Sequence, residues 1–163
     1  MLVNMIVDLR LYNRIAIVIG GGIEGSRKVR GLLNQNCKII VITNRMNRYL
    51  SSLQNQNKIS VIKSRLADAK LILDDYNNIN LIIAATNDKI LNRSLVNKAR
   101  QMHVFAYASD DPQYSDFSYL SLIPLRDGFQ VGISTSGRSP IMSRRIRIRA
   151  ERILQKMESE IKL

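Results

Sequence analysis

Three glycines with the spacing Gly-x-Gly-x-x-Gly, Gly20, Gly22 and Gly25, directly follow an apolar run. Residues 14–19 have the composition of a strand buried on both faces, and residues 26–33 carry apolar side chains at helical spacing. In this context Gly20 lets the chain turn sharply, Gly22 lets the backbone approach a pyrophosphate, and Gly25 lets the helix pack closely on the strand. The phosphates would lie on N–H groups at the helix start, where the helix dipole favours negative charge. The pattern predicts a dinucleotide site; the alternative is a glycine-rich turn without a ligand.

Apolar runs and helix-like segments alternate from residue 14 to residue 108. Strands are expected at residues 14–19, 38–43, 59–62, 81–85 and 104–108, and helices at residues 26–33, 46–56, 68–76 and from Asn87 or Asp88 to Arg100. Asp68 lies near the start of the third helix, where an N-cap is favoured. The fourth helix has one apolar stripe, Ile90, Leu91, Leu95, Val96 and Ala99. The alternation predicts an α/β fold with a Rossmann-type doubly wound parallel sheet.

A hairpin is expected after this alternation ends. Residues 109–112, Ser-Asp-Asp-Pro, form a turn-forming cluster. Beyond it, residues 117–125 and 129–134 flank Asp127-Gly128, a strong signal for a hairpin turn. An apolar hairpin that follows a parallel sheet must bury one face against another element.

One helix remains to cover that hairpin, at residues 139–162, with Ser139 as its cap and Pro140 in its first position. Because this helix is the only cover within the chain, we expect a second copy of the chain to supply the rest. The sequence thus predicts an NAD-binding Rossmann domain at residues 1–112. Residues 113–163 are expected to form a dimerisation and substrate-side hairpin and helix, which makes a homodimer.

The chain is strongly basic, with 25 Lys plus Arg against 13 Asp plus Glu, a formal charge of +12 and a pI near 10.3. A nucleic acid, an acidic membrane surface or a polycarboxylate small molecule would each complement this charge. Many of the cations lie late in the chain, at Arg138, Arg144, Arg145, Arg147, Arg149, Arg152, Lys156 and Lys162. A solvated helix face explains such a run equally well.

The composition indicates a folded, soluble, cytoplasmic protein. Hydrophobic residues make up 45% of the chain, no apolar stretch reaches the ~20 residues that cross a bilayer, and the first residues lack a signal-peptide pattern. The single cysteine, Cys37, has no partner for an intrachain disulfide or a cysteine metal site. We expect it to be a small buried hydrophobe, with a reactive thiol as the alternative.

Four separated motifs occur in the order found in one family. They are Gly20-Gly-Gly with Arg27-Lys28, Ile83-Ala-Ala-Thr-Asn-Asp88 with Asn92, Asp110-Asp-Pro, and Ser134-Thr-Ser-Gly-Arg-Ser-Pro140. Through them, residues 13–150 resemble the dehydrogenase part of siroheme synthase, the precorrin-2 dehydrogenases. The resemblance implies an enzyme that oxidises precorrin-2 to sirohydrochlorin with NAD, in siroheme or related modified-heme biosynthesis.

The resemblance also assigns a catalytic residue. In the family an aspartate after the fifth strand is implicated in the chemistry, and Asp110 stands at the matching position. A carboxylate at the carboxyl end of a parallel strand faces the crevice where such sheets bind ligands, which suits a general base. The alternative role for Asp110 is that of a turn former before Pro112, and Asp111 is the second candidate for the base.

The cofactor site can be extended beyond the glycines. Ile23 and Glu24 belong to the phosphate turn, through their backbone N–H groups. Where many NAD sites have an acidic residue after the second strand, this chain has Asn44 and Arg45. Asn44 can bind a ribose hydroxyl and Arg45 can accept a 2′-phosphate, so NADP stays open although the resemblance favours NAD. The residues after the fourth strand, Thr86 and Asn87, are expected either to line the cofactor or to cap the next helix.

A tetrapyrrole substrate with many carboxylates would explain the positive charge. Ser134, Thr135, Ser136 and Arg138 resemble the family's tetrapyrrole-side loop, and Arg144 and Arg145 are supplementary candidates. His103, the only histidine, is expected to be structural.

One residue departs from the family pattern, and three other functions were considered. Tyr107 stands where family members commonly have Asn, which affects the expected substrate contacts. Some relatives also insert iron into sirohydrochlorin, but one histidine and one cysteine provide no metal-ligand cluster, so no metal site is expected and ferrochelatase activity is secondary. A non-catalytic NAD(H)-sensing module is the main alternative, because Rossmann domains also bind nucleotides without chemistry. Asp110 and residues 134–140 distinguish the two hypotheses, since a pure sensor would need neither. Nucleic-acid binding by the last helix is disfavoured because the chain has few aromatic residues and no recognised reading motif.

Overall fold

The computed structural model describes residues 5–136 and 138–160, with side chains to residue 157. The chain divides into two compact units. We call Met5–Phe117 the sheet unit and the described part of Ser118–Leu163 the hairpin unit.

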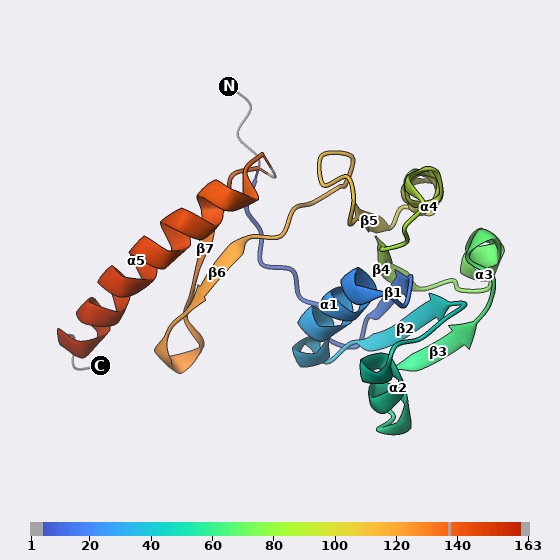
Figure 1. Ribbon diagram of the computed structural model, residues 1–163, viewed down its shortest axis with the longest axis horizontal. Coiled ribbons are helices and arrows are strands. Elements are labelled where there is room, and N and C mark those ends of the chain that lie inside the picture. The colour runs from blue at the N-terminus through green and yellow to red at the C-terminus, as the bar shows by residue number, and fades with distance from the viewer. Residues whose placement is uncertain (1–4, 137, 161–163) are drawn as a thin grey trace. The chain divides into compact units, whose positions relative to one another are not determined.

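The sheet unit contains five parallel strands in the order β3-β2-β1-β4-β5 (Figure 1). The strands are β1 (Ile15–Ile19), β2 (Lys38–Thr43), β3 (Ser60–Lys63), β4 (Ile79–Ala84) and β5 (Phe105–Ala108). At the centre of the sheet, Ile17 of β1 pairs with Ile40 of β2 and Ile82 of β4. The strand order reverses between β1 and β4, which is where ligands bind in sheets of this kind.

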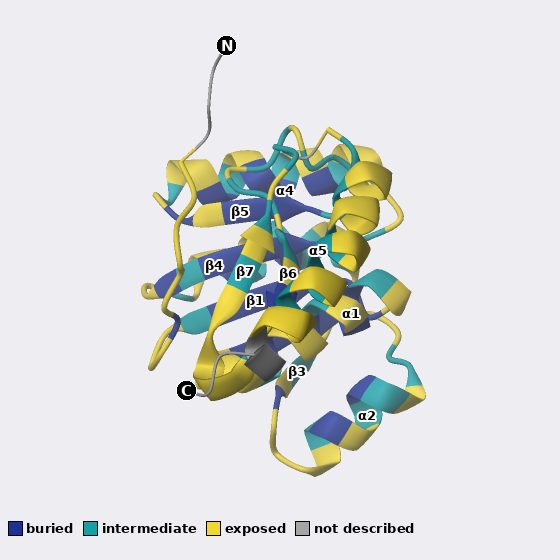
Figure 2. Ribbon diagram, turned by 90° about the vertical axis from the view of Figure 1, so that its left-hand side faces the viewer, coloured by how far each residue is buried: buried dark blue, intermediate teal, exposed yellow. Residues whose placement is uncertain are grey.

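Four helices cover the two faces of this sheet: α1 (Ile23–Leu32), α2 (Arg48–Asn55), α3 (Ala69–Asp74) and α4 (Lys89–Gln101). Val29 of α1 and Leu50 of α2 share a core with Val18 on one face. Side chains of α3 and α4, such as Leu95, pack with Ile17 on the other. Because neighbouring residues of β1 are buried on opposite faces, its whole length is apolar, and Figure 2 shows β1 and β4 largely as buried residues. The structure confirms the predicted doubly wound α/β fold.

The predicted apolar stripe of α4 is wrong at one position. Ile90 is 82% exposed, whereas Asn92 is fully buried. Asp88 caps the helix by accepting the N–H groups of Ile90 and Leu91 at 2.9 and 3.0 Å, so Ile90 lies in the first turn, outside the packed surface. The buried residues of α4 keep the i, i+3, i+4, i+7 spacing, at Asn92, Leu95, Val96 and Ala99.

Three other helix starts differ from the prediction. α2 begins at Arg48 and not at residue 46, because Asn47 caps it. α1 begins at Ile23 and not at residue 26, because the helix follows the glycine turn directly. Asp68 does not cap α3 with its side chain, which instead accepts a hydrogen bond from Arg65 Nε at 3.1 Å. The chain enters α3 through a 3₁₀ turn, η2 (Leu66–Asp68).

The hairpin unit pairs β6 (Ser121–Pro124) antiparallel with β7 (Gln130–Ile133). Asp127 and Gly128 adopt positive φ values of 54° and 80°, and the Phe129 N–H donates to the Arg126 carbonyl at 3.1 Å. Two consecutive positive φ values give the twist that joins antiparallel strands tightly, which is why Asp-Gly occurs here. The predicted hairpin is thereby confirmed.

The last helix, α5 (Pro140–Glu160), packs against β6 and β7. Ser139 Oγ accepts the Met142 N–H at 3.2 Å, which confirms the predicted cap, and Ile123 of β6 is fully buried. The predicted end of this helix at residue 162 lies outside the described residues. Much of α5 remains exposed (Figure 2).

Candidate functional site

The glycine turn is held by close backbone contacts between β1, α1 and the end of β4. Gly20 has a φ of +114°, and a Cβ there would collide with the carbonyl oxygen of Ala85. A Cβ on Gly25 would collide with the carbonyl oxygen of Gly20, so α1 can pack on β1 only with glycine at this position. Around Gly22 the space is open, with nothing within 4 Å of where a Cβ would be. The middle of the turn therefore leaves room for a ligand group beside the backbone.

Gly21 is a constraint that the spacing did not reveal. A Cβ at this position would collide with the Arg45 carbonyl oxygen and with Thr43 Oγ1. Thr43 Oγ1 also donates to that carbonyl at 2.7 Å and accepts the Arg45 N–H at 3.3 Å. The loop after β2 thus lies against the glycine turn. No local sequence signal could have identified this contact between distant segments.

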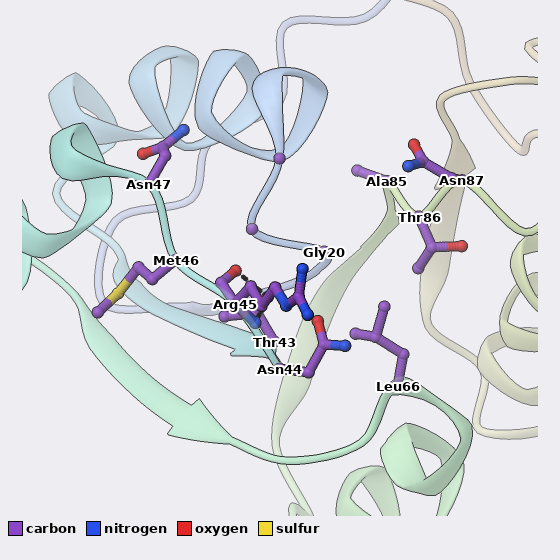
Figure 3. A pocket seen from close by; sticks show the side chains of 12 residues that line it. Gly20, Thr43, Asn44, Arg45, Met46, Asn47, Leu66, Ala85, Thr86 and Asn87 are labelled. Atoms are coloured by element: carbon purple, nitrogen blue, oxygen red, sulfur yellow. Dashed lines mark hydrogen bonds between the residues drawn. The ribbon is translucent and has the colours of Figure 1, made fainter.

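A cavity of about 360 Å³ opens at the carboxyl ends of β1, β2 and β4. Its lining consists of Gly20–Gly22, residues 43–47, Leu66 and residues 85–87 (Figure 3). Of the predicted cofactor residues, the cavity brings together Gly20, Gly22, Asn44, Arg45, Thr86 and Asn87. The other three, Ile23, Glu24 and Gly25, lie in the first turn of α1 and do not line it.

The charge of this cavity distinguishes it from a standard NAD pocket. Among the described residues that line it, none carries a carboxylate and Arg45 is the only cation. Figure 3 shows the side chains of Asn44 and Arg45 between the glycine turn and Leu66. These side chains can donate hydrogen bonds to ribose hydroxyls or to a phosphate.

Asn47, which lines the same cavity, is hydrogen-bonded to Ser26 of α1, and sequence reasoning missed both residues. Asn47 Nδ2 donates to Ser26 Oγ at 2.6 Å, and Asn47 Oδ1 caps α2 by accepting the Leu50 N–H at 3.0 Å. The start of α2 is thereby tied to α1. Asn47 gave a local cap signal, but its partner lies 21 positions away in the sequence.

Asp110 lies just beyond the carboxyl end of β5 and is exposed. Its Oδ1 accepts a hydrogen bond of 2.6 Å from Nδ2 of the buried Asn92. The same amide binds Thr86, a residue of the first cavity. One side chain therefore links the loops that follow β4 and β5.

The neighbouring Asp111 has different hydrogen-bond partners. Its Oδ2 lies 2.8 Å from Arg93 Nη2, and its Oδ1 accepts the Tyr114 N–H at 3.2 Å. The hydrogen bond from Arg93 lowers the pKa of Asp111 and raises that of Arg93. Both aspartates line a second cavity of about 280 Å³ together with Lys89, Ile90 and Arg93. This cavity offers two cations beside the exposed carboxylate of Asp110.

Tyr107, the departure from the family pattern, is buried on the α1 face of the sheet. Its ring packs on Phe117 with 5.4 Å between centroids, and Lys28 Nζ lies 4.1 Å from its centroid. Burial lowers the pKa of Lys28 to about 8 and raises the pKa of Tyr107. Tyr107 is therefore a packing residue within the sheet unit.

The candidate substrate loop belongs to the hairpin unit and forms a compact turn before α5. Thr135 Oγ1 accepts the Ser139 N–H at 3.3 Å, and the Arg138 N–H donates to the Thr135 carbonyl at 3.0 Å. Ser134 Oγ accepts the N–H of Ser136, which has a positive φ of 52°. The four candidates Ser134, Thr135, Ser136 and Arg138 thus share one local structure.

Cys37 and His103 were also considered as candidates in the sequence. Cys37 is only half-buried; its thiol donates weakly to the Leu32 carbonyl, and burial raises the pKa of the thiol. His103 adopts a positive φ of 56° in the turn after α4. Among the described residues, no group of three or more His, Cys, Asp or Glu side chains could hold a metal ion. Within the same ranges, none of the helices has the length and apolar content that a membrane span requires.

Comparison with known proteins gives matches over most of the chain. The family model described as "Putative NAD(P)-binding" matches residues 7–121. The siroheme synthase of Neisseria meningitidis serogroup C is 31% identical over 144 residues, which cover 88% of this chain and 29% of that relative. The siroheme synthase of Sodalis glossinidius is 33% identical over 150 residues, 92% of this chain and 30% of that relative. The chain therefore spans less than a third of the length of these curated relatives.

A solved structure shares the fold. The precorrin-2 dehydrogenase SirC matches with a TM-score of 0.70 and 20% sequence identity, over 98% of this chain and 72% of that chain.

Proposed function

The chain belongs to the NAD(P)-binding family whose model matches residues 7–121, and from this premise we propose that it is an NAD-dependent dehydrogenase that oxidises precorrin-2 to sirohydrochlorin. The reaction would serve the biosynthesis of siroheme or a related modified heme. The observation that carries the proposal is the exposed carboxylate of Asp110. Asn92 is hydrogen-bonded both to this carboxylate and to Thr86, which lines the first cavity. The names of the relatives and of the structural neighbour support the same pathway.

The residues around the first cavity fit a nicotinamide dinucleotide. The open backbone at Gly22 and the N–H groups at the start of α1 would receive the pyrophosphate, as the predicted roles of Ile23 and Glu24 require. Asn44 and Arg45 would hold the adenosine ribose, and Thr86 and Asn87 would line the path towards the nicotinamide. The bound cofactor would supply the hydride acceptor. NAD is the proposed form, and Arg45 makes 2′-phosphate binding the alternative to be measured.

Asp110 supplies the second half of the oxidation. The substrate loses a hydride to the nicotinamide and a proton to a base, so that the macrocycle gains one double bond. Asp110 is exposed and stands at the carboxyl end of a parallel strand, whereas Arg93 engages the carboxylate of Asp111. We therefore assign the base to Asp110, with Oδ2 as the atom that receives the proton because Oδ1 accepts the Asn92 amide.

The substrate carboxylates would bind to hydrogen-bond donors and cations of the chain. Ser134, Thr135, Ser136 and Arg138 form the proposed tetrapyrrole loop. Lys89 and Arg93, which line the second cavity beside Asp110, are additional cations for the same substrate. The charge of +12 would favour the approach of this polyanion. We also propose that the protein acts in the cytoplasm as a homodimer built on residues 113–163.

The test is anaerobic incubation of the purified chain with precorrin-2 and NAD, followed by the absorption spectrum of sirohydrochlorin. NAD and NADP are titrated separately in the absence of substrate. Turnover that falls by about 10²- to 10⁴-fold in Asp110→Asn, at unchanged NAD affinity, supports the dehydrogenase and its base. Tight NAD binding without turnover by the wild type would replace this proposal with an NAD(H)-sensing module. Addition of Fe²⁺ to the product separately tests for ferrochelatase activity.

A further inference from the structure

Asn92 is a fully buried polar residue on the face of α4 that packs against the sheet. The same helix face is otherwise formed by Leu95, Val96 and Ala99. A buried amide is costly unless each of its polar atoms has a partner, so its presence in an apolar row requires an explanation.

Each donor and acceptor position of this amide has a hydrogen-bond partner. Nδ2 donates to the Thr86 carbonyl at 3.0 Å and to Asp110 Oδ1 at 2.6 Å. Oδ1 accepts the Thr86 N–H at 3.1 Å and the Thr86 hydroxyl at 2.7 Å. An amide has two donor hydrogens and two acceptor positions, and all four are used. If the amide were turned over, its oxygen would face two other oxygens, so only one orientation is satisfied.

These bonds join the two loops on which the proposed chemistry depends. Thr86 follows β4 and lines the first cavity, while Asp110 follows β5 and lines the second. β4 and β5 are neighbouring parallel strands, with Ala84 paired to Ala108, so both loops leave the same edge of the sheet. Because α4 is packed through Leu95 and Val96, Asn92 is a rigid anchor between them.

We infer that Asn92 is a positioning residue, which fixes the Asp110 carboxylate relative to the cofactor-side loop at Thr86 and directs Asp110 Oδ2 towards the substrate. This inference rests on the proposed function. Asn92 acts through Asp110 and touches neither the substrate nor the reacting atoms. Its replacement should therefore reduce the rate constant of the chemical step much more than the affinity for the cofactor.

The experiment compares Asn92→Asp with a matched change on the same helix, Asn97→Asp. The first replaces the amide donor by a second carboxylate oxygen facing Asp110 Oδ1 and the Thr86 carbonyl, but keeps the acceptor for Thr86. The second keeps its only described role, because Asn97 Oδ1 accepts the Tyr114 hydroxyl at 2.6 Å and a carboxylate can do the same. Single-turnover oxidation of precorrin-2, the Kd for NAD and the melting temperature are measured for both variants, for Asp110→Asn and for the double variant Asn92→Asp with Asp110→Asn.

We expect Asn92→Asp to slow turnover by about 10- to 100-fold, with the Kd for NAD within about threefold of the wild-type value. Asn97→Asp should retain the wild-type rate. In the double variant, the exchanged amide and carboxylate restore a donor and acceptor pair, so the melting temperature should recover relative to Asn92→Asp while turnover stays at the level of Asp110→Asn.

Two results would overturn the inference: wild-type turnover in Asn92→Asp, or a loss that multiplies in full with that of Asp110→Asn. The latter would mean that Asn92 acts independently of Asp110. A failure of the proposed function is distinguishable, because then the wild type would bind NAD but would not oxidise precorrin-2. That outcome would also remove the positioning role of Asn92 in catalysis, whereas recovery of the melting temperature in the double variant would still measure its contact with residue 110.

Discussion

Lys28 Nζ on α1 lies 4.1 Å from the centre of the Tyr107 ring on β5, so that a half-buried cation meets the face of a buried aromatic ring. Burial outweighs the attraction of Glu24 and lowers the pKa of Lys28 from 10.5 to about 8. The folded chain therefore releases this proton more readily than the unfolded chain does.

The first prediction concerns stability as a function of pH. Between pH 8 and about 9.5 the unfolded state holds the Lys28 proton while the folded state loses it, so the free energy of unfolding should rise with pH. Lys28→Met should flatten this rise, and Lys58→Met, at an exposed lysine, should preserve it. Urea denaturation at closely spaced pH values measures the slope. An equal slope in the wild type and Lys28→Met would contradict the assignment. Above pH 10 the raised pKa of Tyr107 acts in the opposite direction, so the window ends below it.

The second prediction separates the two adjacent aspartates. Arg93 Nη2 lies 2.8 Å from the Asp111 carboxylate on the surface of the sheet unit, where such an ion pair contributes little to stability. Asp111→Asn should therefore change turnover by about fivefold at most, in contrast to the far larger loss expected for Asp110→Asn. Parallel initial-rate measurements with precorrin-2 and NAD test this difference. A greater loss in Asp111→Asn than in Asp110→Asn would assign the base to Asp111.

The elements of the fold could largely be predicted from local patterns. The strand at residues 38–43 coincides with β2 because a continuous apolar run is a strong local signal. The Ser139 cap was similarly readable, and the cap of α4 was narrowed to Asn87 or Asp88, of which the structure has Asp88, since a cap and its partner lie within a few residues of each other. Helix boundaries were less accurate where a 3₁₀ turn or the glycine turn altered the entry to the helix.

The internal geometry of the candidate site could not be read in the same way. Three pairs of residues come into contact only after the sheet has formed. They are Asn92 with Asp110, Asn47 with Ser26, and Gly21 with Arg45. The apolar periodicity of the α4 sequence could not show that Asn92, and not Ile90, is buried against the sheet. The choice between them depends on the rotation of α4, which the Asp88 cap and the packing of Leu95 determine together.

The third prediction uses three glycine-to-alanine changes in one segment. Gly25→Ala forces a Cβ onto the Gly20 carbonyl and should strongly destabilise the sheet unit. Gly22→Ala meets open space, so it should leave the fold intact and weaken NAD binding, because the methyl group would occupy the place proposed for the pyrophosphate. Gly31→Ala, within α1 and also in open space, should stabilise the chain by about 0.5–1 kcal/mol and leave NAD binding unchanged. Thermal unfolding and NAD titration distinguish these results. If Gly22→Ala bound NAD as the wild type does, the pyrophosphate would have to lie elsewhere.

The last prediction concerns the apolar surface of the hairpin unit. Exposed large apolar side chains recur along α5, at Ile141, Met142, Ile146, Ile148, Ile153 and Met157, and Leu122 and Phe129 add to them on the hairpin. Residues 142, 146, 153 and 157 follow helical spacing, so they form one stripe on the helix. An exposed apolar stripe of this kind is typical of an interface, and a second copy would bury it against itself.

We expect the wild type to elute as a dimer in size-exclusion chromatography with light scattering, and Ile153→Glu to elute as a monomer because it places a charge within the stripe. Gln155→Glu is the matched control, since it introduces the same side chain at an exposed position of α5 outside the stripe, and it should remain a dimer. A monomeric wild type, or a dimer that Ile153→Glu leaves intact, would contradict the assignment of this surface. If the wild type is a dimer and Ile153→Glu a monomer, their turnover shows whether oxidation requires both copies, because the proposed substrate residues Ser134, Thr135, Ser136 and Arg138 lie in the same unit as the stripe.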